Sequence, residues 1–265
     1  MTETQQDLDL PAPPWRSRRA PKRKPRQRAP LSKDLIIATA LRVVVAEGLD
    51  AVTVRRIAEE LETGSASLYT HVSGKEEIFD LVLDLAAAGI EVPAPEPEQW
   101  AEQVKQVAWD IYRVFCAHGD VARIALGTIP TGPNMLRIAE GLLDLMVSAG
   151  IPVQAAAWSI DRLLLYVASD AYQSALFLTH RRDGQTIAEF GAQFLGEIRD
   201  FYASLPADRF PHTSANAVTL TTGGGDQRFG YGLELLLDGL TGRLAAGCGT
   251  GLDARADGKT ERKAH

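Results

Sequence analysis

Apolar residues recur at the i, i+3, i+4, i+7 spacing of amphipathic helices along most of the chain, whereas the alternation typical of strands is nearly absent. The first such pattern runs from Ser32, a helix-capping residue, to Gly48, and a second begins after Thr53. A tight turn at 62–65 then leads to a short helix over about 65–71. The pattern therefore predicts an all-α fold that begins with three closely spaced helices.

The later part of the chain predicts longer helices separated by Gly- and Pro-rich breaks. Ser73 and Glu76 have the spacing of a capping box, which would start a fourth helix at about Gly74. The Pro-rich segment 89–100 indicates a boundary between subdomains, and residues 118–131 should form a short helix and a loop. Further helices are predicted after Trp100 and over about 133–149, 153–178, 186–205 and 227–246, with a mobile loop over 206–227.

Charge is distributed unevenly along the 265 residues, whose net charge is -6. Residues 1–32 hold 8 of the 28 Lys and Arg and 3 of the 34 acidic residues, a balance of +5, so the remainder carries -11. Because the first segment is rich in proline and lacks apolar periodicity, residues 1–31 are predicted to be a disordered basic arm. Such an arm can be a solubilising tail or can bind nucleic-acid phosphates by releasing counterions.

Several classes of protein and site lack support in this sequence. No apolar run approaches the ~20 residues of a membrane span, and the N-terminus lacks the apolar core of a signal peptide, which predicts a cytoplasmic protein. Cys116 and Cys248 have no metal-site or disulfide spacing, and Cys116 is interpreted as a core residue. The glycine run at 222–226 lacks the strand and the lysine of a phosphate loop. We therefore expect no enzyme, no metal and no cofactor.

Two motifs then point to a known family. T-V-R-R-I-A at 53–58 is followed by S-L-Y-x-H-V-x-x-K at 67–75, and this combination resembles the DNA-binding end of the tetracycline repressor (TetR) family. A weaker likeness continues at 118–131 and 228–240. The resemblance implies the following division of the chain: a helix-turn-helix DNA-binding domain at 32–77, a larger helical ligand-binding and dimerisation domain at 78–248, and a flexible tail at 249–265.

The resemblance also implies which side chains meet DNA. In a helix-turn-helix the second helix of the pair lies in the major groove and presents its N-terminal residues to base edges. By similarity, bases would be read by Ser65, Ala66, Ser67 and Thr70, phosphates would be held by Tyr69, His71 and Lys75, and the preceding helix would be anchored by Thr53 and Arg55. Leu68 and Val72 are interpreted as core residues, whereas Tyr69 and His71 could also be ordinary packing residues. No base-facing residue makes a bidentate contact, so direct readout should be modest.

Two features of this segment depart from a simple DNA reader. Many relatives place Gly where this chain has Glu62, and if that position needs a positive φ, Glu costs ~1 kcal/mol more than Gly. Gly64 is the alternative place for the bend. Residues 33–84 also hold 5 basic and 10 acidic residues, so the basic arm is expected to compensate by lying along the duplex.

The resemblance implies that the helix near 153–178 and the last helix form a four-helix dimer interface, although an intramolecular core predicts the same apolar stripes. The other helices would enclose an effector pocket. Tetracycline receptors of the family hold a magnesium–drug complex with a histidine just before Leu-Gly-Thr, where this chain has Ala125. Because a hard cation prefers oxygen or imidazole ligands, we expect instead an uncharged, largely apolar effector. The candidate pocket residues, by correspondence, are Val107, Ile111, Ala125, Thr128 and Ile129.

These observations predict a ligand-responsive transcriptional regulator, and more specifically a repressor that binds a near-palindromic DNA operator as a homodimer. Its DNA affinity would be controlled by a small, largely apolar effector. The alternative is a helical ligand-binding or adaptor protein whose basic arm binds acidic surfaces.

Overall fold

The computed structural model describes residues 30–118, 120–179 and 184–245. The chain divides into two units, residues 1–32 and residues 33–265, and the helices belong to the second. Over the described residues the chain is helical and contains no strand, so the predicted all-α fold is confirmed. The predicted disorder of the arm and the flexible tail at 249–265 lie outside the described residues, apart from the last residues of the arm.

The first three helices form a small head. They are α1 (Lys33–Glu47), α2 (Val54–Glu60) and α3 (Ser65–Leu68), with a 3-10 turn, η1 (Leu49–Ala51), after α1. Thr53 caps α2 as predicted, because its hydroxyl oxygen accepts a hydrogen bond from the Arg56 main-chain N–H at 3.0 Å. Ile36, Ile57 and Leu68, one from each helix, are fully buried. The three helices of the head therefore share one apolar core.

Helix α3 is shorter than the predicted 65–71. It ends at Leu68, and the next turn is closed by hydrogen bonds from the main-chain N–H groups of His71 and Val72 to the Leu68 carbonyl, at 2.9 and 3.0 Å. The turn before α3 places Glu62 at φ 50°, whereas Gly64 has φ -85°. The bend is thus not relocated to Gly64, and Glu62 adopts the left-handed conformation that favours glycine.

Helix α4 (Lys75–Ala86) begins with a different contact from the predicted one. The capping residue is Glu77 and not Glu76: its carboxylate accepts hydrogen bonds from the Ser73 N–H at 2.6 Å and the Ser73 hydroxyl at 2.7 Å. Lys33, at the start of α1, donates to the same carboxylate at 2.6 Å. Lys33 and then Ser73 lower the pKa of Glu77 to about 2. This contribution to stability is present above the ordinary carboxyl pKa and is lost as the pH falls toward 2.

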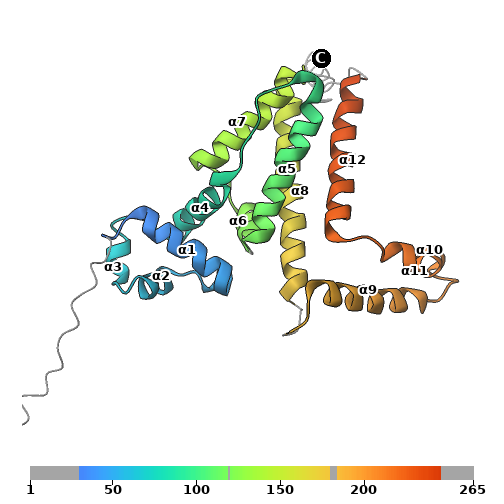
Figure 1. Cartoon of the computed structure of the whole chain (residues 1–265), viewed down its shortest axis with the longest axis horizontal. Helices are drawn as coiled ribbons and strands as arrows, with labels where there is room; N and C mark the ends of the chain where they lie inside the picture. The colour runs from blue at the N-terminus through green and yellow to red at the C-terminus, as the bar shows by residue number, and fades with distance from the viewer. Residues whose placement is uncertain (1–29, 119, 180–183, 246–265) are drawn as a thin grey trace, which may run out of the picture. The chain divides into compact units, whose positions relative to one another are not determined.

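The remaining helices form the body (Figure 1). Helix α8 (Val153–Thr179) is central and contacts α5, α6, α7 and α12. The other elements of the body are η2 (Ala87–Gly89), η3 (Pro97–Gln99), α5 (Trp100–Ala117), α6 (Val121–Gly127), α7 (Pro133–Ser148), α9 (Ile187–Ala203), α10 (Pro211–Ala215), α11 (Ala217–Leu220) and α12 (Gly225–Ala245). The predicted order of helices is confirmed, and the Pro-rich segment runs extended from residue 90 to residue 96 between η2 and η3.

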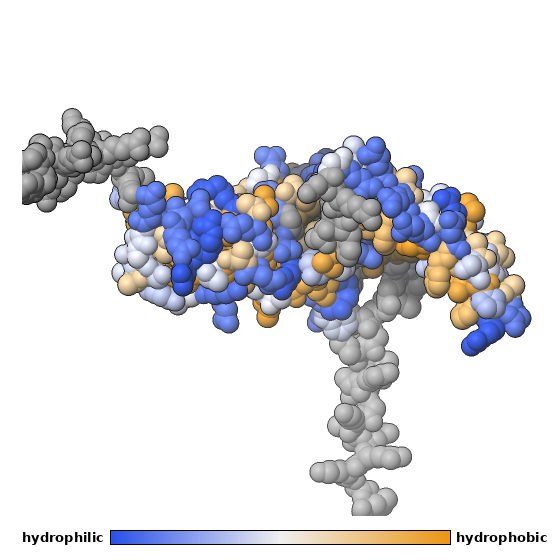
Figure 2. Space-filling model, turned by 90° about the horizontal axis from the view of Figure 1, so that it is seen from below, coloured by the Kyte–Doolittle hydropathy of each residue, from blue (hydrophilic) through white to orange (hydrophobic). Residues whose placement is uncertain are grey.

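The predicted loop over 206–227 is wrong. Two short helices, α10 and α11, form there and pack against α9, with Ala217 buried. Apolar residues gather on the surface at this end of the body (Figure 2), where Ile187, Phe201 and Val218 are more than half exposed. Helices of four or five residues are too short for a periodic pattern, which is why the sequence did not predict them.

Two sets of polar contacts join the head and α4 to the body. Asp84 on α4 is only 6% exposed, and its carboxylate accepts from the main-chain N–H groups of Asn134 and Met135 at 2.8 and 3.0 Å. The Asn134 amide donates to it as well, at 2.9 Å. Asp84 therefore caps the N-terminus of α7 from a different helix.

The second set lies between α6 and the turn after α1. Asp120 accepts from the Leu49 main-chain N–H at 2.8 Å, and Arg123 pairs with Asp50 at 3.0 Å. Arg123 lowers the pKa of Asp50, chiefly through its side-chain hydrogen bond. The body thus contacts the head directly through α6 as well as through α4.

The strained turn leads to a stability prediction. Left-handed backbone costs a residue with a side chain about 1–2 kcal/mol, while glycine costs about 0.5–1 kcal/mol in unfolded-state entropy. We therefore expect Glu62→Gly to raise the free energy of unfolding by ~0.5–1 kcal/mol, and Glu62→Val, which is β-branched, to lower it. Urea unfolding followed by circular dichroism measures both. A Gly variant less stable than the Val variant would contradict the assigned bend.

Candidate DNA-binding surface and effector site

Helix α3 separates its core residues from its candidate DNA contacts. Leu68 is fully buried and Val72 is 2% exposed, as predicted, and they hold the short helix against the head. The candidate base readers are accessible: Ala66, Ser67 and Thr70 are exposed and Ser65 is partly exposed. Among the candidate phosphate contacts, Tyr69 is 57% exposed, Lys75 is exposed and His71 is partly exposed. The structure therefore brings these side chains to the surface around one short helix.

The hydroxyl groups on this surface differ in the hydrogen-bond donors and acceptors that remain available for DNA. The Thr70 hydroxyl donates to the Ser67 carbonyl at 2.7 Å, so its oxygen remains an acceptor and its methyl group remains available for apolar contact. The Thr53 hydroxyl is already used as the cap of α2. Because the oxygen accepts in that bond, the Thr53 O–H can still donate to a phosphate oxygen, and the N-terminus of the helix also favours anions.

Two of the head's four cationic side chains are paired with acids within the head. Arg55 donates to Glu59 at 2.9 Å, and this hydrogen bond raises the pKa of Arg55. Arg56 lies between Glu47 at 2.6 Å and Glu60 at 2.9 Å. Exposed pairs of this kind contribute little to stability, so a phosphate could compete for Arg55. The pairs nevertheless weaken the head's attraction to DNA, in line with its predicted need for the arm.

The five candidate effector residues do not line one cavity. Val107 and Ile111 are fully buried on the inner face of α5, and the Thr128 hydroxyl donates to the Ile124 carbonyl at 3.0 Å. Ala125 is partly exposed, whereas Ile129 is 85% exposed. Val107 and Ile111 are therefore core residues in this conformation, and Ile129 is a surface residue.

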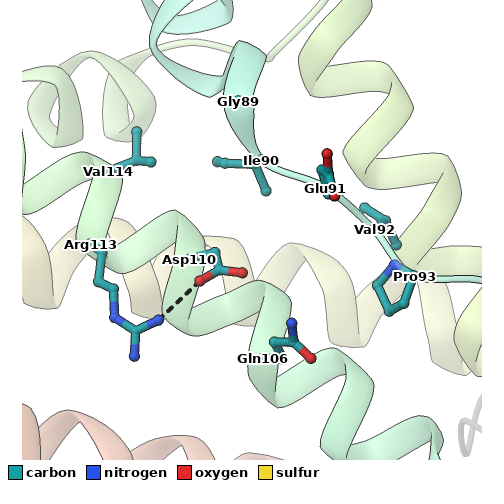
Figure 3. Close-up of a pocket in the computed structure, with 9 residues that line it drawn as sticks. All are labelled: Gly89, Ile90, Glu91, Val92, Pro93, Gln106, Asp110, Arg113 and Val114. Atoms are coloured by element: carbon teal, nitrogen blue, oxygen red, sulfur yellow. Dashed lines mark hydrogen bonds and ion pairs between the residues drawn. The ribbon is translucent and has the colours of Figure 1, made fainter.

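A cavity lies instead on another face of α5, against the extended segment 90–96, which we call the strap (Figure 3). Its volume is about 470 Å³, within the range of small-molecule sites. We call it the strap groove, and it is lined by Gly89, Ile90, Glu91, Val92 and Pro93 on one wall and by Gln106, Asp110, Arg113 and Val114 on the other. The sequence analysis missed these residues, although the Pro-rich composition of 89–100 signalled an extended segment that must pass along a helix.

Helices α8 and α12 present a second apolar surface. Trp158 and Leu165 on α8 are 45% and 38% exposed, and Tyr231 and Leu235 on α12 are 66% and 56% exposed. On α12 the opposite side packs inward through Phe229 and other apolar residues. Both helices therefore have one apolar side in the core and further apolar residues on the surface.

Two further observations concern membrane-spanning helices and the exposure of Cys116. Among the helices of the described residues, none combines the length and the apolar composition that crossing a membrane requires. Cys116 is exposed, so its interpretation as a core residue is wrong. It lies near the end of α5, where its neighbours Tyr112 and Phe115 are buried.

Comparison with known proteins agrees with this arrangement. The family model described as bacterial regulatory proteins, tetR family, matches residues 36–82, and the model described as tetracyclin repressor-like, C-terminal domain, matches residues 92–244. The chain belongs to the tetracycline repressor family. Its members are transcriptional regulators, so the predicted function of a ligand-responsive transcriptional repressor is confirmed at that level.

Individual relatives within the family include repressors and proteins solved with ligands. The HTH-type transcriptional repressor DrrR1 of Streptomyces coeruleorubidus is 30% identical over 85% of this chain and 82% of its own length. The TetR family protein ActR of Streptomyces coelicolor, solved in complex with actinorhodin, is 41% identical, with a TM-score of 0.71 over 80% of this chain and 96% of that one. The class C tetracycline repressor of Escherichia coli is 25% identical over 79% of this chain and 90% of its own length.

The pairing of Arg55 generates a prediction about DNA affinity. We expect Glu59→Gln to release Arg55 for a phosphate, which should tighten binding and steepen its salt dependence by about one counterion. Fluorescence anisotropy of one duplex at several salt concentrations measures this. Glu76→Gln, which removes one charge from the exposed first turn of α4, is the matched control. Equal effects of the two substitutions would show that only net charge matters.

Proposed function

We propose that the protein binds a near-palindromic DNA operator as a homodimer, with α3 of each subunit in a major groove. The observation that carries this proposal is the division of α3 into buried Leu68 and outward-facing small polar residues. Small side chains let the helix approach the base edges closely. Hydroxyls can donate to or accept from several bases, and methyl groups can contact the thymine methyl. Sequence preference would therefore come from a few modest contacts together with the shape of the duplex.

The remaining candidates would position the head on the backbone. The hydroxyl of Tyr69 and the ammonium group of Lys75 are exposed beside α3 and can each reach a phosphate oxygen. Lys75 lies over the Phe79 ring at 5.0 Å, which leaves its ammonium group accessible. His71 and Arg55 would act in the same way, Arg55 after leaving Glu59. Such contacts fix register and add affinity without reading sequence.

The homodimer is proposed from the exposed apolar residues of α8 and α12. A two-fold dimer uses the same surface of each subunit, so these helices would pair with their mates in a four-helix bundle. Trp158 and Tyr231 are the largest exposed apolar side chains there and would be the aromatic anchors of the interface. The two reading helices would then meet half-sites about 34–36 Å apart, or a multiple of this spacing.

Control by an effector would pass through the contacts that join body and head. Asp84 ties α4 to the start of α7, and Asp120 and Arg123 tie α6 to the turn after α1. A molecule that binds two arrangements of α6 and α7 unequally would therefore change the position of the head. Similarity to ActR, solved with actinorhodin, supports a small-molecule effector, and its largely apolar character stays the prediction made from the sequence. The cytoplasmic location predicted from the sequence stays a prediction.

Selection of bound sequences from random duplex DNA tests the proposed function. We expect the full-length protein to enrich a near-palindrome with two equivalent half-sites, because two identical heads are related by a two-fold axis. Substituting both Ser67 and Thr70 by Ala should broaden the enriched sequences while leaving circular dichroism unchanged. Recovery of no sequence preference would favour the adaptor alternative, in which the basic arm binds acidic surfaces generally.

A second prediction concerns the basic arm. Deleting residues 1–30 removes 8 positive charges, and we expect weaker DNA binding with a flatter dependence on salt, by about 0.9 for each phosphate that the arm no longer neutralises. Anisotropy titrations of the full-length and shortened proteins on the same duplex measure both quantities. An unchanged salt slope in the shortened protein would rule out binding of the arm to DNA.

A further inference from the structure

One wall of the strap groove is the strap itself, which is held by hydrogen bonds near both of its ends and has unused main-chain groups between them. Near its start the Ile90 carbonyl accepts from Arg137 of α7 at 2.7 Å. Near its end Gln103 of α5 donates to the Ala94 carbonyl at 2.8 Å and accepts from the Glu96 N–H at 3.0 Å. Between these contacts the main-chain groups of residues 91 and 92 have no hydrogen-bond partner among the described residues. The wall is thus rigidly placed and still able to bind.

The opposite wall is a row of polar side chains on α5. Asp110 pairs with Arg113 at 3.0 Å through one carboxylate oxygen, and the guanidinium lies over the Trp109 ring at 5.4 Å. Figure 3 shows Arg113 on the far side of Asp110 from the strap. The second oxygen of Asp110 has no partner among the described residues, and Gln106 adds a neutral amide beside it. Arg113 therefore compensates Asp110 only in part and does not reach across the groove.

The charges and surfaces of the groove together select a type of ligand. Glu91 on the strap and Asp110 on α5 are two carboxylates against one guanidinium, while Ile90, Val92, Pro93 and Val114 provide apolar surface. The surrounding chain, outside residues 1–32, carries a net charge of -11, which attracts cations over a distance. We propose that the strap groove binds a small amphipathic cation, with an apolar ring system in the groove and one ammonium group between Glu91 and Asp110.

The position of the groove links such a ligand to the head. The strap follows directly on η2, which continues α4, the helix that packs against α1. A molecule that bridges the strap and α5 would restrain the end of α4 relative to the body. This regulatory meaning rests on the proposed function, whereas the binding itself does not. The site differs from the candidates Val107 and Ile111, which are buried on a different face of α5.

Three fluorescent probes with one shared ring system test the proposal. They are 9-(methylaminomethyl)anthracene, a cation, 9-anthracenemethanol, which is neutral, and 9-anthracenecarboxylic acid, an anion. In titrations of the full-length protein at low salt we expect the amine to bind at least tenfold more tightly than the alcohol, and the acid to bind most weakly. Equal affinity for the amine and the acid would overturn the proposal.

Substitutions then assign the site. Glu91→Gln and Asp110→Asn should each weaken amine binding about three- to tenfold and leave alcohol binding unchanged, and the double variant should lose the preference for the amine. Glu98→Gln, an exposed carboxylate on η3 outside the groove, is the matched control and should change nothing. A preference that persists in the double variant would overturn the assignment of these two carboxylates.

A steric block provides a test that does not depend on charge. Gly89 lines the groove, and a Cβ atom added there meets no atom within 4 Å, so Gly89→Leu places a bulky side chain at the groove without a clash at Cβ. We expect Gly89→Leu to weaken binding of both the amine and the alcohol, whereas Ala88→Leu, which introduces the same side chain at an exposed neighbour outside the groove, should weaken neither. Unchanged binding in Gly89→Leu would overturn the site.

Measurements on the same samples distinguish a failure of the groove proposal from a failure of the proposed DNA-binding function. Operator binding by the unmodified chain, measured with and without the amine, reports on DNA recognition independently of the groove. Selective DNA binding without amine binding would remove the groove proposal and leave the function. Amine binding that is weakened by the groove substitutions, without selective DNA binding, would support the groove and contradict the proposed function.

Discussion

The carboxylate of Asp84 is the contact on which the arrangement of this molecule depends. It lies on α4, is nearly inaccessible to water, and has three donors, all from Asn134 and Met135 at the start of α7. Separation of α4 and α7 would break all three hydrogen bonds to this charged group, which is unfavourable. The same helix packs against α1 at its other end. The position of the head therefore follows from the position of α7, and contacts between α6 and the head add to this restraint.

Much of the fold could be predicted from the chain itself because its helices are long and periodic. The burial of Leu68 and Val72 and the cap at Thr53 follow from local spacing, which does not depend on distant parts of the chain. Other features depend on side-chain direction or on contacts between distant segments. Glu77 rather than Glu76 reaches Ser73 because α4 begins one residue later, after Gly74, and Lys33 approaches from another helix.

The two candidate sites also differ in whether local sequence or contacts between separate segments form them. A short helix with outward-facing Ser67 and Thr70 can be read from a motif of consecutive residues. The strap groove requires an extended segment to lie beside a helix that begins several residues later, and no periodic pattern reports such a pairing. Correspondence with tetracycline receptors instead pointed to Val107 and Ile111, which are fully buried core residues here.

The size of α3 has a consequence for how the protein fails on heating. Four residues cannot form a stable helix alone in water, so the candidate DNA-binding surface exists only while Leu68 stays in its apolar site. The head contains few of the chain's helical residues, and the body contains most of them. Local melting of the head would thus abolish recognition while the bulk helical signal remained almost intact, so loss of helical content is a poor measure of loss of DNA binding.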